Sequence, residues 1–130
     1  MILIDTSAWV EFLRDTDSSV CRRVDKVLSQ KIATCDAVRM EVLAGARDDG
    51  HLNQLRQLLA RATILRTQSV DYEAAAALYR SGRRQGKTIR KLIDCLIAAV
   101  ALRANVPILH MDADFDALSK VSKLRIDAVK

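Results

Sequence analysis

Short apolar runs alternate along the chain with longer amphipathic stretches. The runs predict strands at 2–4, 31–34 and 108–110, a strand or extended link at 63–67, and a last strand at 124–127. Between them, apolar residues recur every three or four positions, which predicts helices near 9–13, 20–28, 36–45, 52–59, 70–84, 92–103 and 113–118. Strands that alternate with helices favour right-handed crossovers. The sequence therefore predicts an α/β fold with a mainly parallel sheet and helices on both faces.

One predicted helix carries a charge inside an otherwise apolar run. Every residue from 92 to 102 is apolar except Asp94. At helical spacing, this acid shares a face with Ile97, Ala98 and Ala101. A buried carboxylate is costly unless something neutralises it. A helix cap, an ion pair with Arg90 four residues earlier, or a metal ion would each do so.

Length and charge restrict the class of protein. The 130 residues predict one domain spanning 1–130, long enough to bury a core. The net charge of +5 suits a polyanionic partner without identifying one. Aromatic residues make up only 4% of the chain, which argues against a base-stacking surface for single strands.

The cysteines and the N-terminus bear on the compartment. Three cysteines without a CxxC motif argue against a disulfide framework and a zinc site, and fit a reducing cytosol. The first residues turn polar too soon for a signal peptide, and no apolar run is long enough to span a membrane. We therefore expect a cytoplasmic protein that does not contact a membrane.

Four acids are predicted to meet at one edge of the sheet. Asp5 and Asp112 each follow a predicted strand, where ligands gather in open α/β sheets, and Glu41 and Asp94 lie on apolar helical faces. Taken singly, Asp5 fits a helix cap, Glu41 a solvated side chain, and 112–116 a polar turn. Together, such carboxylates repel by about 4 kcal/mol per close pair at an effective dielectric of 20. Oxygen ligands without His or Cys favour Mg²⁺ or Mn²⁺, which would activate a water toward a phosphodiester.

Four motifs resemble those of the PIN-domain family, and most closely the VapC ribonuclease toxins of toxin–antitoxin pairs. The resemblance covers essentially the whole chain, and the motifs follow in the expected order: MILIDTS at 1–7, MEVLAG at 40–45, IDCLIAA at 93–99 and HMDADFD at 110–116. The resemblance implies a three-layer α/β/α fold and a Mg²⁺- or Mn²⁺-dependent endoribonuclease that cleaves RNA by metal-activated water. It also implies a homodimer and a VapB-type antitoxin as partner.

The resemblance also assigns residues. Asp5, Glu41, Asp94 and Asp112 match the catalytic acids of the family. The metal ligands would be Asp5, Asp94 and Asp112, with Asp114 able to share or replace the last of these. Ser7 matches the small polar residue that orients the metal shell. Whether one or two ions bind, and which RNA is cut, stays open.

A basic loop precedes Asp94. Arg84, Lys87 and Arg90 are candidates for binding the RNA backbone. The alternative is a solvated helix end, where cations are also favourable. Arg90 is the best candidate for a phosphate contact because it lies one helical turn before Asp94.

Two other functions compete with the nuclease. A phosphatase of the haloacid-dehalogenase type would need a second Asp two residues after the first, where this chain has Ser7. A PIN-like module that binds RNA or protein without catalysis would be expected to lack one of the acids. All four acids are present, so the sequence favours the nuclease.

Overall fold

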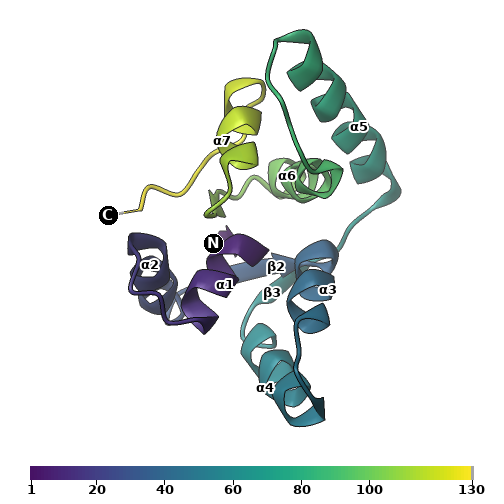
Figure 1. Ribbon diagram of the computed structural model, residues 1–130. Coiled ribbons are helices and arrows are strands. Elements are labelled where there is room, and N and C mark those ends of the chain that lie inside the picture. The colour runs from purple at the N-terminus through teal and green to yellow at the C-terminus, as the bar shows by residue number, and fades with distance from the viewer. Residues whose placement is uncertain (130) are drawn as a thin grey trace.

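A four-stranded parallel sheet forms the centre of the protein. The structure is a computed structural model that describes residues 1–129 (Figure 1). The strands are β1 (Ile2–Ile4), β2 (Ile32–Cys35), β3 (Thr63–Leu65) and β4 (Ile108–Leu109), in the order β3-β2-β1-β4. All three pairings are parallel, and Leu3 of β1 lies between Ala33 of β2 and Ile108 of β4. The first strand is therefore interior, with β4 beside it.

Helices cover both faces of this sheet, as the alternating pattern predicts (Figure 1). Their bounds are α1 (Thr6–Leu13), α2 (Ser19–Val27), α3 (Asp36–Ala44), α4 (Asp49–Leu59), α5 (Ser69–Arg84), α6 (Leu92–Ala104) and α7 (Ala113–Lys120). Helix α5 packs along α6, and both contact α7, while α1 packs against α2 and α3. The result is the three-layer α/β/α arrangement that the sequence predicts.

Polar residues at the predicted boundaries begin several helices. Asp5, Ser18, Asp48 and Asp112 each accept a hydrogen bond from a backbone N–H of the helix that follows. Helix α6 ends at Asn105, whose φ of 56° is left-handed, and Pro107 follows two residues later. These local signals explain why the helix order is predictable from the sequence.

The predicted last strand at 124–127 is wrong. In that segment only Ile126 pairs with the sheet, through an isolated parallel bridge to Ile108. Strand β4 is two residues long and offers no ladder for a longer partner. Two backbone hydrogen bonds flank this bridge, from the N–H of Ile108 to the carbonyl of Arg125 and from the N–H of Asp127 to the carbonyl of Ile108. Arg23 of α2 adds two side-chain hydrogen bonds to Asp127, at 2.9 and 3.0 Å.

A smaller difference concerns the predicted turn at 47–50. Its last two residues belong to α4, which starts at Asp49 because Asp48 caps it. Across residues 1–129, no helix combines the length and the apolar composition that crossing a membrane would require.

Candidate metal centre

Asp5 and Asp112 lie at the carboxyl ends of neighbouring strands. Asp5 directly follows β1, is 3% exposed, and its N–H donates to the carbonyl of Leu109 at the end of β4. Asp112 follows β4, is 8% exposed, and caps α7. Both acids therefore cap a helix and also lie at the sheet edge where a metal site is predicted. The interpretation as helix cap and the interpretation as site residue are compatible.

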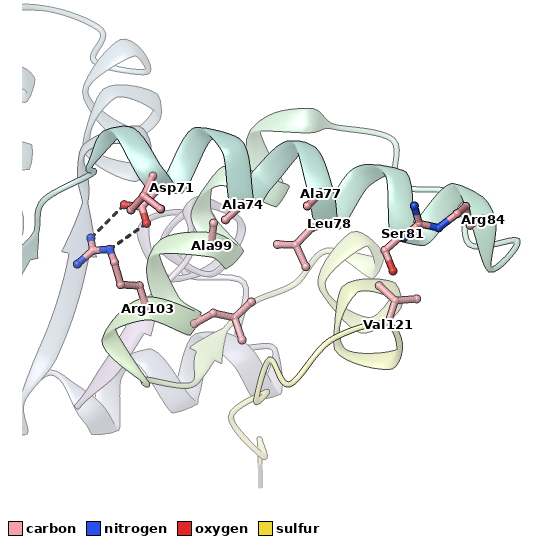
Figure 2. Close-up of a pocket in the computed structure, with 11 residues that line it drawn as sticks. Asp71, Ala74, Ala77, Leu78, Ser81, Arg84, Ala99, Arg103 and Val121 are labelled. Carbon is pink, nitrogen blue, oxygen red and sulfur yellow. Dashed lines mark hydrogen bonds and ion pairs between the residues drawn. The ribbon is translucent and has the colours of Figure 1, made fainter.

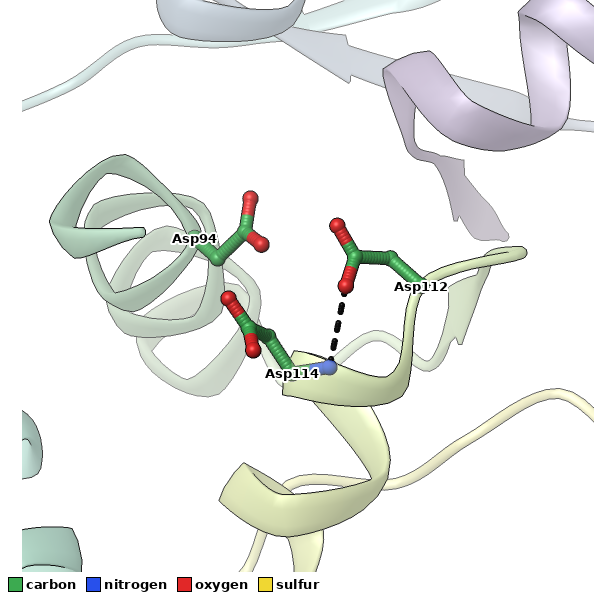
Figure 3. Close-up of side chains that lie close together, drawn as sticks. All are labelled: Asp94, Asp112 and Asp114. Carbon is green, nitrogen blue, oxygen red and sulfur yellow. Dashed lines mark hydrogen bonds between the residues drawn. The ribbon is translucent and has the colours of Figure 1, made fainter. Parts of the chain in front are cut away.

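Asp94 joins them from the first turn of α6. It is 2% exposed, and the helix face it shares with Ile97, Ala98 and Ala101 is buried as predicted. One carboxylate oxygen of Asp94, one of Asp112 and one of Asp114 lie within 4.8 Å of one another (Figure 3). Figure 3 shows the Asp94 carboxyl group pointing from α6 toward the two acids at the start of α7.

Two buried oxygens, one in this group and one on Asp5 outside it, accept no hydrogen bond from the described residues. They are Oδ1 of Asp5 and Oδ2 of Asp94. Burial, with the charges of Asp5 and Asp112 beside it, raises the pKa of Asp94 to about 8. Burial also raises the pKa of Asp5, and the charge of Glu41 adds to this. Unpaired carboxylate oxygens that repel one another are a donor set that fits a hard divalent cation.

Ser7 connects the two strand ends. Its hydroxyl donates to Oδ2 of Asp5 at 2.6 Å and accepts the N–H of Met111 at 2.9 Å, while its own N–H donates to the same Asp5 oxygen. These bonds occupy Oδ2 of Asp5 and leave Oδ1 without a partner. Ser7, which the resemblance assigns to orienting the metal shell, thus lies next to Asp5. It also holds the loop that carries Asp112.

Glu41 lies outside the group of Asp94, Asp112 and Asp114. It is half-buried on α3, and its Oε1 accepts a hydrogen bond from the hydroxyl of Thr6 at 2.8 Å. It is not a member of the group within 4.8 Å, but its charge acts on Asp5. Glu41 therefore extends the acidic cluster along the start of α1.

Asp114 differs from Asp112 in what its oxygens already bind. Asp114 accepts the backbone N–H groups of Arg90 and Lys91, at 3.1 and 2.9 Å, one on each oxygen. This carboxylate fixes the loop before α6. Asp112 instead accepts one backbone bond, from the N–H of Asp114 at 3.0 Å, and its Oδ2 faces a side chain. Oδ2 of Asp112 is therefore bound by no backbone N–H, whereas both oxygens of Asp114 are.

The side chain facing Asp112 is Lys91, which the sequence offers as part of the basic loop that could bind RNA and not as a partner of the acids. Its Nζ lies 2.5 Å from Oδ2 of Asp112 and 3.8 Å from Oδ2 of Asp94. The bond to Asp112 raises the pKa of Lys91. On Asp112, burial favours the neutral acid, but the Lys91 ammonium and the N–H of Asp114 outweigh it and lower the pKa. Only the position of Lys91, directly before the apolar helix of Asp94, could have signalled this contact.

The other predicted cations lie differently. Arg90 does not pair with Asp94, so that alternative from the sequence is wrong. Its guanidinium lies 3.4 Å from Asp112 and 3.5 Å from Asp114, with a side chain 66% exposed. Within residues 1–129, neither Arg84 nor Lys87 forms an ion pair with these acids. Arg84 lines a different hollow, of about 590 Å³, between α5 and the helices α6 and α7 (Figure 2).

Comparison with known proteins gives three results. The PIN-domain family model matches residues 2–121. The chain is 44% identical to the VapC ribonuclease Mb1587 of Mycobacterium bovis and to ribonuclease VapC11 of Mycobacterium tuberculosis, over 96% of this chain and 96% of each relative. Its fold is similar to a chain in the crystal structure of VapBC2 from Rickettsia felis bound to a promoter DNA fragment, with a TM-score of 0.76, 18% identity and 98% coverage of both chains.

Proposed function

The chain belongs to the PIN-domain family and to its VapC ribonucleases, and from this premise we propose that the carboxylates of Asp5, Asp94 and Asp112 form its metal-dependent active site. The observation that supports the site most directly is the pair of buried oxygens without partners, Oδ1 of Asp5 and Oδ2 of Asp94. Both belong to side chains at most 3% exposed, so an uncompensated charge there is costly. A divalent ion removes that cost.

The ion that best fits these donors is Mg²⁺ or Mn²⁺. The proposed ligands Asp5, Asp94 and Asp112 offer carboxylate oxygens alone, and the close group of Asp94, Asp112 and Asp114 includes no histidine and no cysteine. Bound there, such an ion would lower the pKa of a water and offset the negative charge of a phosphodiester. Asp114 would hold the loop before α6 and would not bind the metal, because both of its oxygens already accept backbone N–H groups.

Other residues of the chain would orient Asp5, transfer a proton and contact the RNA. Ser7 holds Asp5 in one orientation through two hydrogen bonds. Glu41, outside the close trio, is placed to accept or return a proton beside Asp5, and Asp112 is the other candidate for this role. Arg90, exposed at the rim of the cluster, would contact a phosphate of RNA, with Lys87 and Arg84 binding the backbone further away.

The biological setting follows from the family. The relatives are named VapC ribonucleases, and the similar fold comes from a VapBC complex. We infer that this chain is the toxin of a toxin–antitoxin pair, is inhibited by a VapB-type antitoxin, acts in the cytoplasm, and forms a homodimer of single-domain subunits spanning 1–130. The net charge of +5 suits both RNA and an acidic inhibitor.

RNA cleavage with and without metal tests the proposal. We expect the purified chain to cut RNA with Mg²⁺ or Mn²⁺, and EDTA to stop the reaction. Asp94→Asn should reduce cleavage at least about a hundredfold while the circular dichroism spectrum stays that of the wild type. Cleavage that persists in EDTA, or in a folded Asp94→Asn variant, would contradict the metal site.

A catalytically silent PIN-like module would give a different result. Such a protein would bind RNA in the same experiment without cutting it in any metal. If the chain does cut RNA, sequencing the RNA ends produced after brief expression would identify the target and the cleavage position.

A further inference from the structure

Lys91 places a positive charge where the acidic oxygens converge. Its ammonium lies 2.5 Å from Oδ2 of Asp112 and 3.8 Å from Oδ2 of Asp94, and Asp5 also acts on its charge. The same three acids are the proposed metal ligands. Oδ2 of Asp94 has no hydrogen-bond partner among residues 1–129, and the Lys91 ammonium is the cation that pairs with it there.

The backbone of Lys91 is held by Asp114, whereas its ion-paired side chain is half exposed to solvent. The N–H of Lys91 donates to Asp114 at 2.9 Å, and the residue caps α6. Its side chain is 52% exposed, whereas those of Asp94 and Asp112 are 3% and 5% exposed. A lysine stem has four rotatable carbons and a strongly hydrated head. The ammonium can therefore move from the acids into solvent without disturbing the loop.

We propose that Lys91 is a built-in counter-ion that occupies the metal position in the metal-free protein and that a divalent ion must displace. This inference rests on the proposed metal site and adds a regulatory step to it. A monovalent ammonium offsets part of the repulsion among the carboxylates, which keeps the metal-free protein folded. A divalent ion replaces it because it carries twice the charge and coordinates several oxygens at once.

Displacement gives Lys91 a second position. The pinned backbone keeps the released ammonium at the mouth of the acidic cluster, beside the exposed Arg90. A charge at that place would face a polyanion approaching the metal. Metal loading and the exposure of a phosphate-binding lysine are thus coupled through one side chain.

Metal affinity of Lys91→Met tests this proposal. Methionine keeps much of the stem length and removes the charge, and calorimetry with Mn²⁺ gives Kd directly. We expect binding about tenfold tighter than in the wild type, because the competing cation is gone. We also expect a lower melting temperature without metal, because the acids lose their counter-ion. Lys120→Met, in the last turn of α7, makes the same change in net charge and should leave Kd nearly unchanged.

The outcomes separate this proposal from the metal site itself. If neither the wild type nor Lys91→Met binds Mn²⁺, the metal site is wrong. If the wild type binds Mn²⁺ and Lys91→Met binds it no more tightly, the site stands and the counter-ion proposal is overturned. An equal tightening in Lys120→Met would also overturn it, because a general charge effect would then explain the change.

A measurement on the unaltered protein does not depend on the variant folding. Acetylation of lysines followed by mass spectrometry reports how accessible each ammonium is. We expect Lys91 to react slowly without metal and several-fold faster with saturating Mn²⁺, with Lys120 reacting equally in both. An unchanged rate at Lys91 while Mn²⁺ is bound would show that the metal does not displace it.

Discussion

In the metal-free protein, the protonated form of the Asp94 carboxyl group is favoured near neutral pH. Burial and the charges of Asp5 and Asp112 raise its pKa to about 8 from an ordinary value of 3.8. The folded state therefore binds this proton more tightly than the unfolded chain does. Its contribution to the free energy of unfolding is complete below about pH 4 and is lost as the pH rises toward 8.

The metal-free protein should accordingly lose stability as the pH rises from 5 to 8. We expect Asp94→Asn to remove much of this dependence and to be the more stable protein at pH 8, by at least about 1 kcal/mol, or about 4 °C in melting temperature. Urea unfolding in EDTA at several pH values measures this. Identical pH profiles for the two proteins would mean that the proton is not held at Asp94.

The two aspartates at the start of α7 should respond differently to the same change. Asp112→Asn should weaken Mn²⁺ binding at least about tenfold, because it alters an oxygen that faces Asp94. Asp114→Asn should instead cost about 1–3 kcal/mol of stability, because its carboxylate holds the N–H groups of Arg90 and Lys91. Calorimetric Kd values and unfolding curves for both variants measure this. The reverse pattern would make Asp114 the ligand.

At the scale of helices, one ion pair joins the start of α5 to the end of α6. Asp71 is 1% exposed, and the guanidinium of Arg103 makes two hydrogen bonds to its carboxylate, at 2.9 and 3.0 Å (Figure 2). Arg103 also donates to the carbonyl of Arg66 at 2.7 Å. This side chain therefore connects the segment after β3 to the helix that carries Asp94.

Removing Arg103 should destabilise the protein without affecting the metal. Arg103→Ala leaves Asp71 buried without its cation, which we expect to cost about 3 kcal/mol. Arg103→Lys, which keeps the charge but not the paired hydrogen bonds, should cost less. Urea unfolding gives both values, and the Mn²⁺ Kd of each folded variant should match the wild type. A loss below about 0.5 kcal/mol in Arg103→Ala would mean that the pair is not important for stability.

At the scale of the whole molecule, the proposed metal site joins parts of the chain that the sheet brings together. Asp5 comes from the end of β1, Asp94 from α6 and Asp112 from the end of β4. Their proximity depends on β1 and β4 being neighbours, although a hundred residues separate them in the sequence. An ion bound to all three therefore stabilises the folded state only.

Metal should raise the melting temperature by mass action. At a metal concentration about one hundred times Kd, the expected gain is about 2.7 kcal/mol, and EDTA should reverse it. Asp5→Asn should lose most of the gain, because Asp5 contributes an oxygen that has no other partner. Thermal unfolding against Mn²⁺ concentration measures this. A full metal-dependent shift in Asp5→Asn would exclude Asp5 as a ligand.

The sequence alone determined the features that depend on neighbouring residues. Apolar spacing gave the order of the helices and the first four strands, and the position of Asp94 within an apolar run gave its burial. The four motifs gave the family, which the comparisons confirm. Such features are local: a helix face or a strand end is set by residues a few positions apart.

Only the tertiary structure decided which groups meet across the chain. The sequence matches Asp112 to the fourth acid and leaves Asp114 able to share or replace it, and the structure shows that the loop before α6 occupies both oxygens of Asp114. Lys91, not Arg90, pairs with Asp94. Of the four residues predicted as a last strand, Ile126 alone pairs with β4. Distance and direction between side chains arise from how the helices pack on the sheet, and no spacing along the chain specifies them.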